Sequence, residues 1–352
     1  MIGGIFLLGS TLLIYFHEKV LTTYPIDIYK SDIIPTIQVC VNRFLAGEPV
    51  YTPIDEFHYD HFPNYMPLKW LPFVIAEWFG FEYRWIPLVI GLIGIGFYQV
   101  NLLKQNHHLV LAILLAVAPF LLLLYYYLNM PWNMAYTVEL MDLGFHLVMF
   151  VAILNGGFLF RGISIVIVLL SRYSIVLWLP VFFLGLFFKE NKMKTVKTAL
   201  VVFIGIAGLY IIPFLSTDWT SFSQGQQAYL LAAQGSWNVS QQDQEKGEIV
   251  PHVMRDQIGI ASYFYLFVEG EKLEKINALK KTHIAVSVFT VLLIGFIFWK
   301  WGSSLPPGYY FLYSLKIYLA IFYAFIQVPF FYLFITPLFL SLFIVQVKDG
   351  GG

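Results

Sequence analysis

Long apolar runs follow one another along almost the whole chain, and they limit its possible folds more than any other feature. Hydrophobic residues make up 59% of the 352 residues and charged residues only 12%, against about 25% charged in a soluble domain. The runs are continuous, whereas a transmembrane barrel would alternate apolar and polar residues. A helical span needs about 20 mostly apolar residues, so we expect an all-α polytopic membrane protein with about ten transmembrane helices. The candidate spans are Ile2–Phe16, Arg84–Leu103, Leu109–Leu128, Tyr136–Leu154, Gly157–Leu170, Ser174–Phe188, Thr198–Leu215, His283–Trp299, Tyr309–Ile326 and Pro329–Val345.

The first run, Ile2–Phe16, has the length of a signal-peptide core. A signal peptide would also carry a basic stretch before the run and a small-residue cleavage site after it. Neither pattern stands here, so we expect a retained first membrane helix. Residues 1–349 are expected to form a single membrane-embedded domain, because they contain no fixed-period repeat and no glycine- or serine-rich linker.

Charge and cysteine content exclude several classes of partner and site. The formal net charge is zero, so the chain offers no polyanion-binding character and we expect no nucleic acid partner. Cys40 is the single cysteine, which excludes an intrachain disulfide, a thiolate metal cluster and a CxxC redox pair.

Lysine and arginine in short loops predict the orientation of the spans. The segment KENKMKTVK, residues 189–197, carries four lysines, so we place it in the cytoplasm. Counting spans outward puts both termini, Lys104, Lys300 and Lys348 on the same side. Two long polar segments, 17–83 and 216–282, then face the non-cytoplasmic side.

Two segments complicate this count. Pro67–Phe79 is apolar but short, and it is interrupted by Lys69 and Pro72, so we interpret it as a helix lying in the membrane interface. Lysines at 272, 275, 280 and 281 fall on the outer side in this topology, against the usual bias. If Gln257–Val268 entered the membrane, the last spans would be inverted.

The first outer segment carries two candidate carboxylates, Asp27 and Asp32. After Asp32, apolar residues recur at helical spacing and Gly47 ends the pattern, which predicts an amphipathic helix. Asp32 would then lie at the helix N-terminus, where free N–H groups stabilise an anion. It is either a helix cap or a functional group near the outer membrane surface. The apolar residues that form the pattern are Ile33, Ile37, Val41 and Leu45.

A polar stretch follows that helix. Imidazole and carboxylate groups can both bind a divalent metal, but the spacing matches no firm metal motif. The stretch is therefore either a metal site or a solvated loop, and its residues are Asp55, Glu56, His58, Asp60 and His61.

Glu139, Asp142 and His146 occur at i, i+3 and i+7 inside a candidate span, so they share one helical face. Ionisable residues inside spans rarely face lipid. They either line a cavity for substrate or a metal, or form a hydrogen-bonded seam between helices.

The first outer segment resembles the GT-C superfamily of polytopic glycosyltransferases, in particular its polyprenyl-phosphate-mannose-dependent branch. The resemblance rests on an acidic residue that opens an amphipathic helix, on a Gly-x-Pro-x-Tyr turn at Gly47–Tyr51, and on Tyr65, Met66 and Pro67 at the start of a second interfacial helix. The run QVPFFYLFITPLFL, residues 327–340, is similar to the family's last boundary and span. Met66 departs from the usual Tyr-Pro-Pro.

This resemblance implies inverting transfer of a hexose or pentose, with mannose favoured, from a polyprenyl-phosphate donor to a hydroxyl of a lipid or glycan acceptor. Such an enzyme would lie in the bacterial inner membrane, among membrane lipids, with its site on the non-cytoplasmic face. The family's acidic residue maps onto Asp32 as general base, with Asp27 as the alternative. Tyr65 would line the substrate cavity. A divalent metal remains possible.

The leaving phosphate needs positive groups. Arg172, in the short turn SRYS between two spans, suits a phosphate through its fork-shaped guanidinium, or it extends to lipid headgroups. Lys69 and Arg84 are further candidates. His252 and Arg255, in PHVMRDQ, either reach the donor or belong to a solvated loop.

Two other classes stay open. A transporter or lipid flippase would usually show repeated halves and polar residues at mid-span, whereas here the polar residues gather in the outer segments. A lipid-sugar ligase or polymerase would place its key residues in a late outer loop. No glycine-rich phosphate loop is visible, so a nucleotide-sugar donor is disfavoured.

Overall fold

The computed structural model describes residues 1–55, 57, 61–240, 244–245, 247–255, 257–301 and 307–348. Within these residues the regular secondary structure is helical, and an isolated antiparallel bridge between Ile54 and His61 is the only pairing of extended backbone. Five helices are long and apolar enough to cross a membrane. They are α1 (Ile2–Thr23), α5 (Trp85–Leu103), α6 (Leu109–Asn129), α11 (Lys192–Ile206) with its π-helical continuation Ala207–Leu215, and α16 (Lys272–Trp301). The chain is therefore a helical protein of membrane character, as the apolar runs predict.

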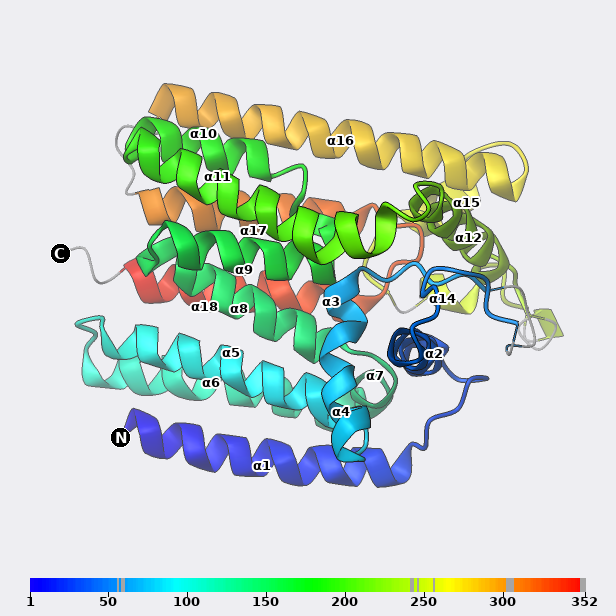
Figure 1. Ribbon diagram of the computed structural model, residues 1–352, viewed down its shortest axis with the longest axis horizontal. Coiled ribbons are helices and arrows are strands. Elements are labelled where there is room, and N and C mark those ends of the chain that lie inside the picture. Colours follow the sequence, from blue (N-terminus) through cyan, green and yellow to red (C-terminus); the bar gives the residue numbers. More distant parts are fainter. Residues whose placement is uncertain are drawn as a thin grey trace.

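Shorter or less apolar helices lie side by side with these five (Figure 1). They also occur where the sequence predicts spans, with boundaries moved by a few residues. One such shift has a clear cause: a proline in the first turn of α10 favours a helix that begins there, and the preceding residues form only a 3-10 turn. These helices are α8 (Glu139–Asn155), α9 (Phe158–Ser171), α10 (Leu179–Lys189), α17 (Pro307–Ala324) and α18 (Ile335–Lys348).

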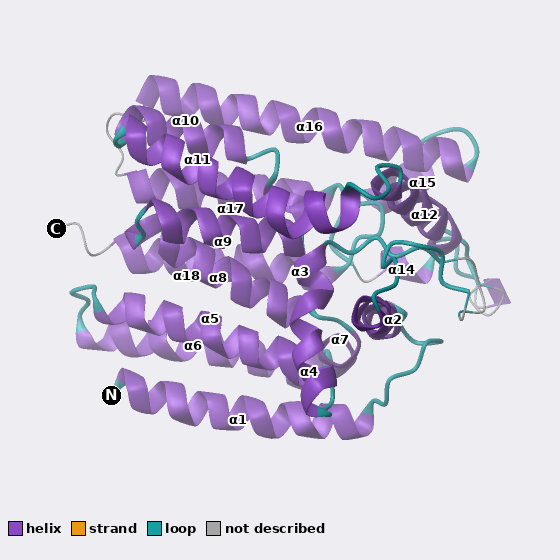
Figure 2. Cartoon of the chain, viewed as in Figure 1, coloured by secondary structure: helices purple, strands orange, loops and turns teal. Residues whose placement is uncertain are grey.

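The two ends of the bundle differ. The N-terminus, the α5–α6 turn, the α10–α11 turn and the end of α18 lie together at one end (Figure 1). The opposite end carries short helices and loops (Figure 2). This segregation agrees with the predicted topology, in which both termini and the lysine-rich segment 189–197 share a side. The short elements at the opposite end include α2 (Ile33–Ala46), α3 (Pro67–Trp70), α4 (Val74–Phe79), α7 (Pro131–Tyr136), α12 (Ser221–Ser236), α14 (His252–Arg255) and α15 (Ala261–Phe267).

The two short helices predicted within residues 17–83 are present. The first, α2, ends at Gly47, whose φ of +73° is the left-handed conformation that glycine adopts without strain. The second, over Pro67–Phe79, consists of α3, a 3-10 turn at Leu71–Phe73 and α4, and it crosses the end of the bundle (Figure 1). The second outer segment folds at the same end, where Ala261 and Phe264 of α15 pack with Leu279 of α16. The position of α15 at this end of the bundle favours the topology in which Gln257–Val268 stays outside the bundle.

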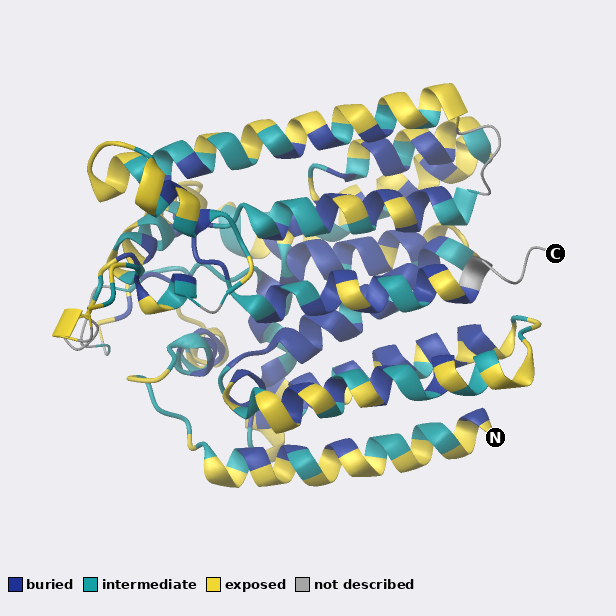
Figure 3. Cartoon of the chain, turned by 180° about the vertical axis from the view of Figure 1, so that it is seen from behind, coloured by how far each residue is buried: buried dark blue, intermediate teal, exposed yellow. Residues whose placement is uncertain are grey.

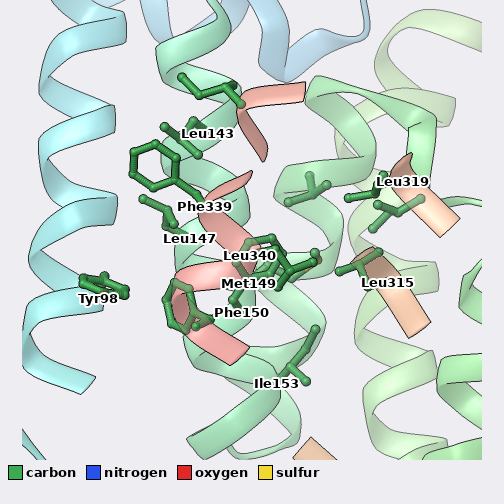
Figure 4. Packing of buried hydrophobic residues seen from close by; sticks show 14 of the residues in the cluster. Tyr98, Leu143, Leu147, Met149, Phe150, Ile153, Leu315, Leu319, Phe339 and Leu340 are labelled. Atoms are coloured by element: carbon green, nitrogen blue, oxygen red, sulfur yellow. The ribbon is translucent and has the colours of Figure 1, made fainter. Parts of the chain in front are cut away.

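α8 occupies the centre of the bundle. Nearly every residue from Glu139 to Ile153 is buried, whereas the outer helices carry a yellow, exposed face (Figure 3). The α5–α8 contact is close because it is lined by glycine: a Cβ added at Gly94 would lie 2.7 Å from the Cα of Gly144. On its other side α8 packs Leu147 and Phe150 against residues of α17 and α18, among them Leu315, Phe339 and Leu340 (Figure 4).

The outward faces of the peripheral helices are apolar. On α1, Leu8 is 76% exposed, and on α16, Leu292 is 66% exposed. A large apolar surface of this kind is unfavourable in water and marks contact with lipid or another partner. Together with the long apolar helices, it supports a membrane location.

Candidate functional site

Four ionisable side chains meet at the end of α8 that carries the short helices. Lys69 of α3 donates a hydrogen bond to Asp142 and lies 3.8 Å from Glu139 Oε1. Arg172, directly after α9, binds Glu139 through both guanidinium nitrogens, with Nη1 2.7 Å from Oε2. Its Nη2 also lies 3.1 Å from Asp142 Oδ2. We call Lys69, Glu139, Asp142 and Arg172 the charge quartet.

The quartet is buried and internally neutral. The side chains of Lys69, Glu139 and Asp142 are 6%, 5% and 1% exposed, while that of Arg172 is 21% exposed. Buried charges are tolerated when they are paired and hydrogen-bonded, and here two cations face two carboxylates. The Ser171 hydroxyl completes the site by donating to Asp142.

Local sequence explains how three elements bring these groups together. Glu139 is the first residue of α8 and Asp142 lies one turn later, so both carboxylates project from the same face, as predicted. Pro67 starts α3 two residues before Lys69. Arg172 stands at the end of α9 in an extended conformation, with φ −148° and ψ 114°, and this change of direction turns its side chain toward α8.

His146, the third member of the predicted polar face, lies deeper in the bundle. It is 1% exposed, and its Nδ1 is 2.7 Å from the Asp142 carbonyl oxygen. Its Nε2 is buried without a hydrogen-bond partner in the described part of the chain. This helical face could line a cavity or form a hydrogen-bonded seam between helices. The seam describes Glu139 and Asp142 best, because both carboxylates bond to side chains of neighbouring elements.

Asp32 occupies the N-cap position of α2, but its carboxylate makes no capping hydrogen bond. The neighbouring Ser31 hydroxyl accepts from the Ile33 N–H at 3.3 Å instead. The Asp32 side chain is 37% exposed, and its Oδ2 lies 3.8 Å from His61 Nδ1. The Asp32 carboxylate is therefore partly exposed and lies beside an imidazole rather than capping α2.

Asp27 has a different role in the structure. Its carboxylate accepts a hydrogen bond from the Tyr29 N–H at 2.9 Å, and its carbonyl oxygen accepts from Lys30 and Ser31. This is a local turn in which the Asp side chain bonds backbone two residues ahead. Of the two candidate bases, Asp27 bonds its own turn, whereas Asp32 lies 3.8 Å from His61.

Contacts across this end of the bundle connect Asp32 to the quartet. The Ser31 hydroxyl donates to the Tyr136 carbonyl oxygen at 3.1 Å, which fixes the start of α2 near the start of α8. The phenol of Tyr332, 7% exposed, interacts electrostatically with Glu139, Arg172 and Asp32. Tyr332 therefore lies near both the partly exposed carboxylate and the buried charges.

A small aromatic hollow, with a volume of about 10 Å³, lies at the loop before α3. Tyr65, predicted to line a substrate cavity, is one of its lining residues. The Tyr51 hydroxyl donates to the Tyr65 carbonyl oxygen at 2.9 Å, and Gln226 donates to the hydroxyl of Tyr173, the neighbour of Arg172, at 3.1 Å. The hollow thus joins the loop before α3, the π-helical segment and α12. Its lining residues include Tyr51, Pro63, Asn64, Tyr65, Met66, Tyr210, Phe222 and Gln226.

Three other predicted phosphate ligands lie elsewhere. Arg84 is 4% exposed and donates to Glu82 at 2.7 Å and to the Tyr24 carbonyl oxygen at 2.6 Å, which fastens the end of α1 to the start of α5. Arg255 of α14 pairs with Glu248 at 3.0 Å, and His252 is exposed. Arg84 is therefore engaged in holding helices together.

The structure describes only some residues of the candidate metal site. Glu56, His58 and Asp60 lie outside the described residues. Among the residues that are described, no group of three or more His, Cys, Asp or Glu side chains is arranged to hold a metal ion.

Sequence patterns missed two members of the site. Ser171 directly precedes Arg172 in the SRYS turn, and this position could have indicated that it belongs to the site. Tyr332 sits in an aromatic run, FFYLF, where nothing distinguishes a site residue from a packing residue.

Comparisons with protein-family models, with curated proteins and with solved structures find no match for this chain.

Proposed function

We propose that the chain is a GT-C-like membrane glycosyltransferase that transfers a sugar from a polyprenyl-phosphate donor to an acceptor hydroxyl. The observation that carries the proposal is the position of Asp32: its side chain is 37% exposed and lies 3.8 Å from His61, at the end of the bundle that carries the interfacial helices. The resemblance of the first outer segment to GT-C enzymes, in which an acidic residue opens this helix, supports the assignment.

In this proposal Asp32 is the general base. Transfer requires removal of a proton from the acceptor hydroxyl as its oxygen attacks the anomeric carbon. Attack from the side opposite the phosphate inverts the configuration at that carbon. The sugar would lie between Asp32 and the cation that binds the leaving phosphate.

Arg172 is the cation that a donor phosphate would meet. It is the most exposed member of the charge quartet, at 21% for its side chain, and a guanidinium binds phosphate oxygens in a two-point geometry. Lys69 would act behind it, since its ammonium is committed to Asp142.

The proposed topology has about ten transmembrane helices, in which the five shorter or less apolar helices cross with the five long ones and the bilayer adapts to their length. The site then lies at headgroup depth on the non-cytoplasmic face, in a bacterial inner membrane. A polyprenyl tail would be held by burial of its apolar surface.

The direct test is incubation of the purified protein with a panel of polyprenyl-phosphate sugars and scoring of donor consumption by mass spectrometry. The wild-type protein should consume at least one donor, and Asp32→Asn should reduce turnover by about 100- to 10,000-fold, the usual contribution of a general base. Asp27→Asn is the matched control, because it changes a nearby carboxylate that serves only its own turn. Equal turnover by wild type and Asp32→Asn would remove Asp32 from the mechanism.

A transporter or lipid flippase is the second candidate, favoured by one observation. Ionisable residues inside a membrane bundle often mark a substrate or ion pathway, and the quartet is such a group. Lipid translocation in vesicles without any donor consumption, and unaffected by Asp32→Asn, would support this class.

A further inference from the structure

His61 is held in a fixed position against the first turn of α2. Its carbonyl oxygen accepts from the Ile54 N–H at 2.8 Å, and its ring lies 5.3 Å, centroid to centroid, from the ring of Phe57. The ring Nε2 is 3.0 Å from the Thr36 hydroxyl, which is completely buried. These contacts leave Nδ1 on the side of Asp32.

Asp32, His61 and Thr36 form a connected chain. The Thr36 N–H donates to the Asp32 carbonyl oxygen at 2.8 Å, as expected one turn along a helix, so the two side chains project from the same face of α2. His61 bridges them, with Nε2 on the Thr36 hydroxyl and Nδ1 3.8 Å from Asp32 Oδ2. The imidazole is 14% exposed in its side chain, against 37% for the carboxylate.

We propose that His61 is a positioning residue for Asp32: it fixes the side on which the carboxylate faces its substrate and receives the proton that the carboxylate collects. This inference rests on the proposed function, because it assigns Asp32 the role of base. It extends that function by naming where the proton goes after the acceptor hydroxyl is deprotonated.

The proton balance is simple. As the acceptor oxygen bonds to the anomeric carbon, the bond from that carbon to the donor phosphate oxygen breaks, and the polyprenyl phosphate leaves with the electron pair. The acceptor O–H bond breaks in the same step, and its proton moves to an Asp32 oxygen. Asp32 then passes it to the lone pair of His61 Nδ1, giving an imidazolium whose Nε2–H bonds the Thr36 hydroxyl. Solvent removes the proton and restores both groups. The separation of 3.8 Å is longer than a hydrogen bond, so a small rotation of the carboxylate must close it before transfer.

The protonation state of His61 suits this role. Burial lowers the pKa of His61 below its ordinary 6.5, and the Asp32 carboxylate acts in the opposite direction. Burial is the larger effect, so the imidazole is neutral near pH 7 and can accept a proton. The groups that face it from α2 in the described part of the chain are the Asp32 carboxylate and the uncharged Thr36 hydroxyl.

A measurement without substrate tests the contact itself. The chain has eight histidines, few enough for NMR titration of the protein labelled with 15N-histidine, with His61→Gln identifying the His61 signal. In Asp32→Asn the titration midpoint of His61 should fall, because the carboxylate that favours the imidazolium is gone. In Asp27→Asn the midpoint should stay unchanged. An unchanged midpoint in Asp32→Asn overturns the proposal, whatever the activity of the protein.

A kinetic measurement tests the role in transfer. Glutamine places an amide near the position of Nε2, so His61→Gln can keep the Thr36 bond while removing the proton acceptor at Nδ1. Its kcat should fall about 10- to 100-fold with little change in KM, the size of effect seen when a supporting group is removed from a reactive one. The acid limb of its pH–rate profile should also move, because the imidazole no longer titrates beside Asp32.

The outcomes separate the two proposals. If Asp32→Asn abolishes transfer and His61→Gln leaves both kcat and the pH profile unchanged, Asp32 remains the base and the role of His61 is refuted. If Asp32→Asn retains full transfer, the proposed base fails, and a shift of the His61 midpoint would then report only a structural ion pair.

Discussion

Arg172 holds Glu139 through two parallel hydrogen bonds, with Nη1 2.7 Å from Oε2 and Nη2 bonded to Oε1. This fork joins the end of α9 to the first turn of α8. Because Nη2 also lies 3.1 Å from Asp142, a single guanidinium contacts both carboxylates at the head of the central helix.

Removing one member of this pair should destabilise the protein strongly. Arg172→Gln leaves Glu139 and Asp142 with only Lys69 as a cation, and loss of one partner from a buried ion pair costs about 3–5 kcal/mol. Thermal unfolding in detergent measures the loss as a fall in Tm. Arg255→Gln is the matched control, since Arg255 pairs with the more exposed Glu248 and should cost at most about 1 kcal/mol. Equal losses in both variants would show that burial of the quartet is not important for stability.

The glycine contact between α5 and α8 should be sensitive to a single methyl group. In Gly144→Ala the added Cβ would overlap the Ile90 carbonyl group, and backbone cannot move aside as a flexible side chain can. Overpacking of this kind costs about 1–3 kcal/mol. Gly96→Ala, also on α5, meets only the ring of Phe6 at 3.7 Å and should be neutral or slightly stabilising. Unfolding midpoints of the two variants distinguish local crowding from a general effect of alanine.

Stability should depend on pH through His61. Burial lowers its pKa from 6.5 in the folded state, so just below pH 6.5 the unfolded chain binds more protons than the folded chain. The contribution of the neutral imidazole to stability is therefore fully present above pH 6.5 and is lost as the pH falls through the folded-state pKa. The difference in Tm between wild type and His61→Gln should shrink from pH 7.5 to pH 5. A constant difference would contradict the lowered pKa.

The orientation can be tested with introduced cysteines. Cys40 is completely buried, so the wild-type chain should react poorly with a membrane-impermeant maleimide. Tyr29→Cys, at a position 77% exposed and three residues before Asp32, should be labelled from the non-cytoplasmic side of intact cells. Met193→Cys, 59% exposed between the lysines of residues 189–197, should react only after permeabilisation. Labelling of both positions from the same side would place Asp32 in the cytoplasm and exclude the proposed site.

Local patterns predicted the elements well. Helical spacing after Asp32 and a terminal glycine defined α2 to within a residue, because both signals lie inside the element that they describe. The face shared by Glu139, Asp142 and His146 was equally accessible, since it depends only on helical geometry. These are interactions between residues a few positions apart.

The pairing of the charges was not accessible in the same way. Lys69 and Asp142 are 73 residues apart, and Arg172 and Glu139 are 33 apart, so which cation meets which carboxylate depends on how α3 crosses the bundle. Considered singly, Lys69 and Arg172 were candidates for phosphate, and Glu139 and Asp142 for a cavity. In the structure each of these cations lies beside a carboxylate. Neither the spacing in the sequence nor the charges alone could have predicted which pairs form.

The neutrality of the quartet has a consequence for anion binding. A phosphate that drew the Arg172 guanidinium toward itself would leave two carboxylates sharing one ammonium in a nearly dry environment. Uptake of a proton would restore the charge balance of such a site. Anion binding at this end of the bundle would therefore be coupled to uptake of a proton from the medium, and it would become tighter as the pH falls.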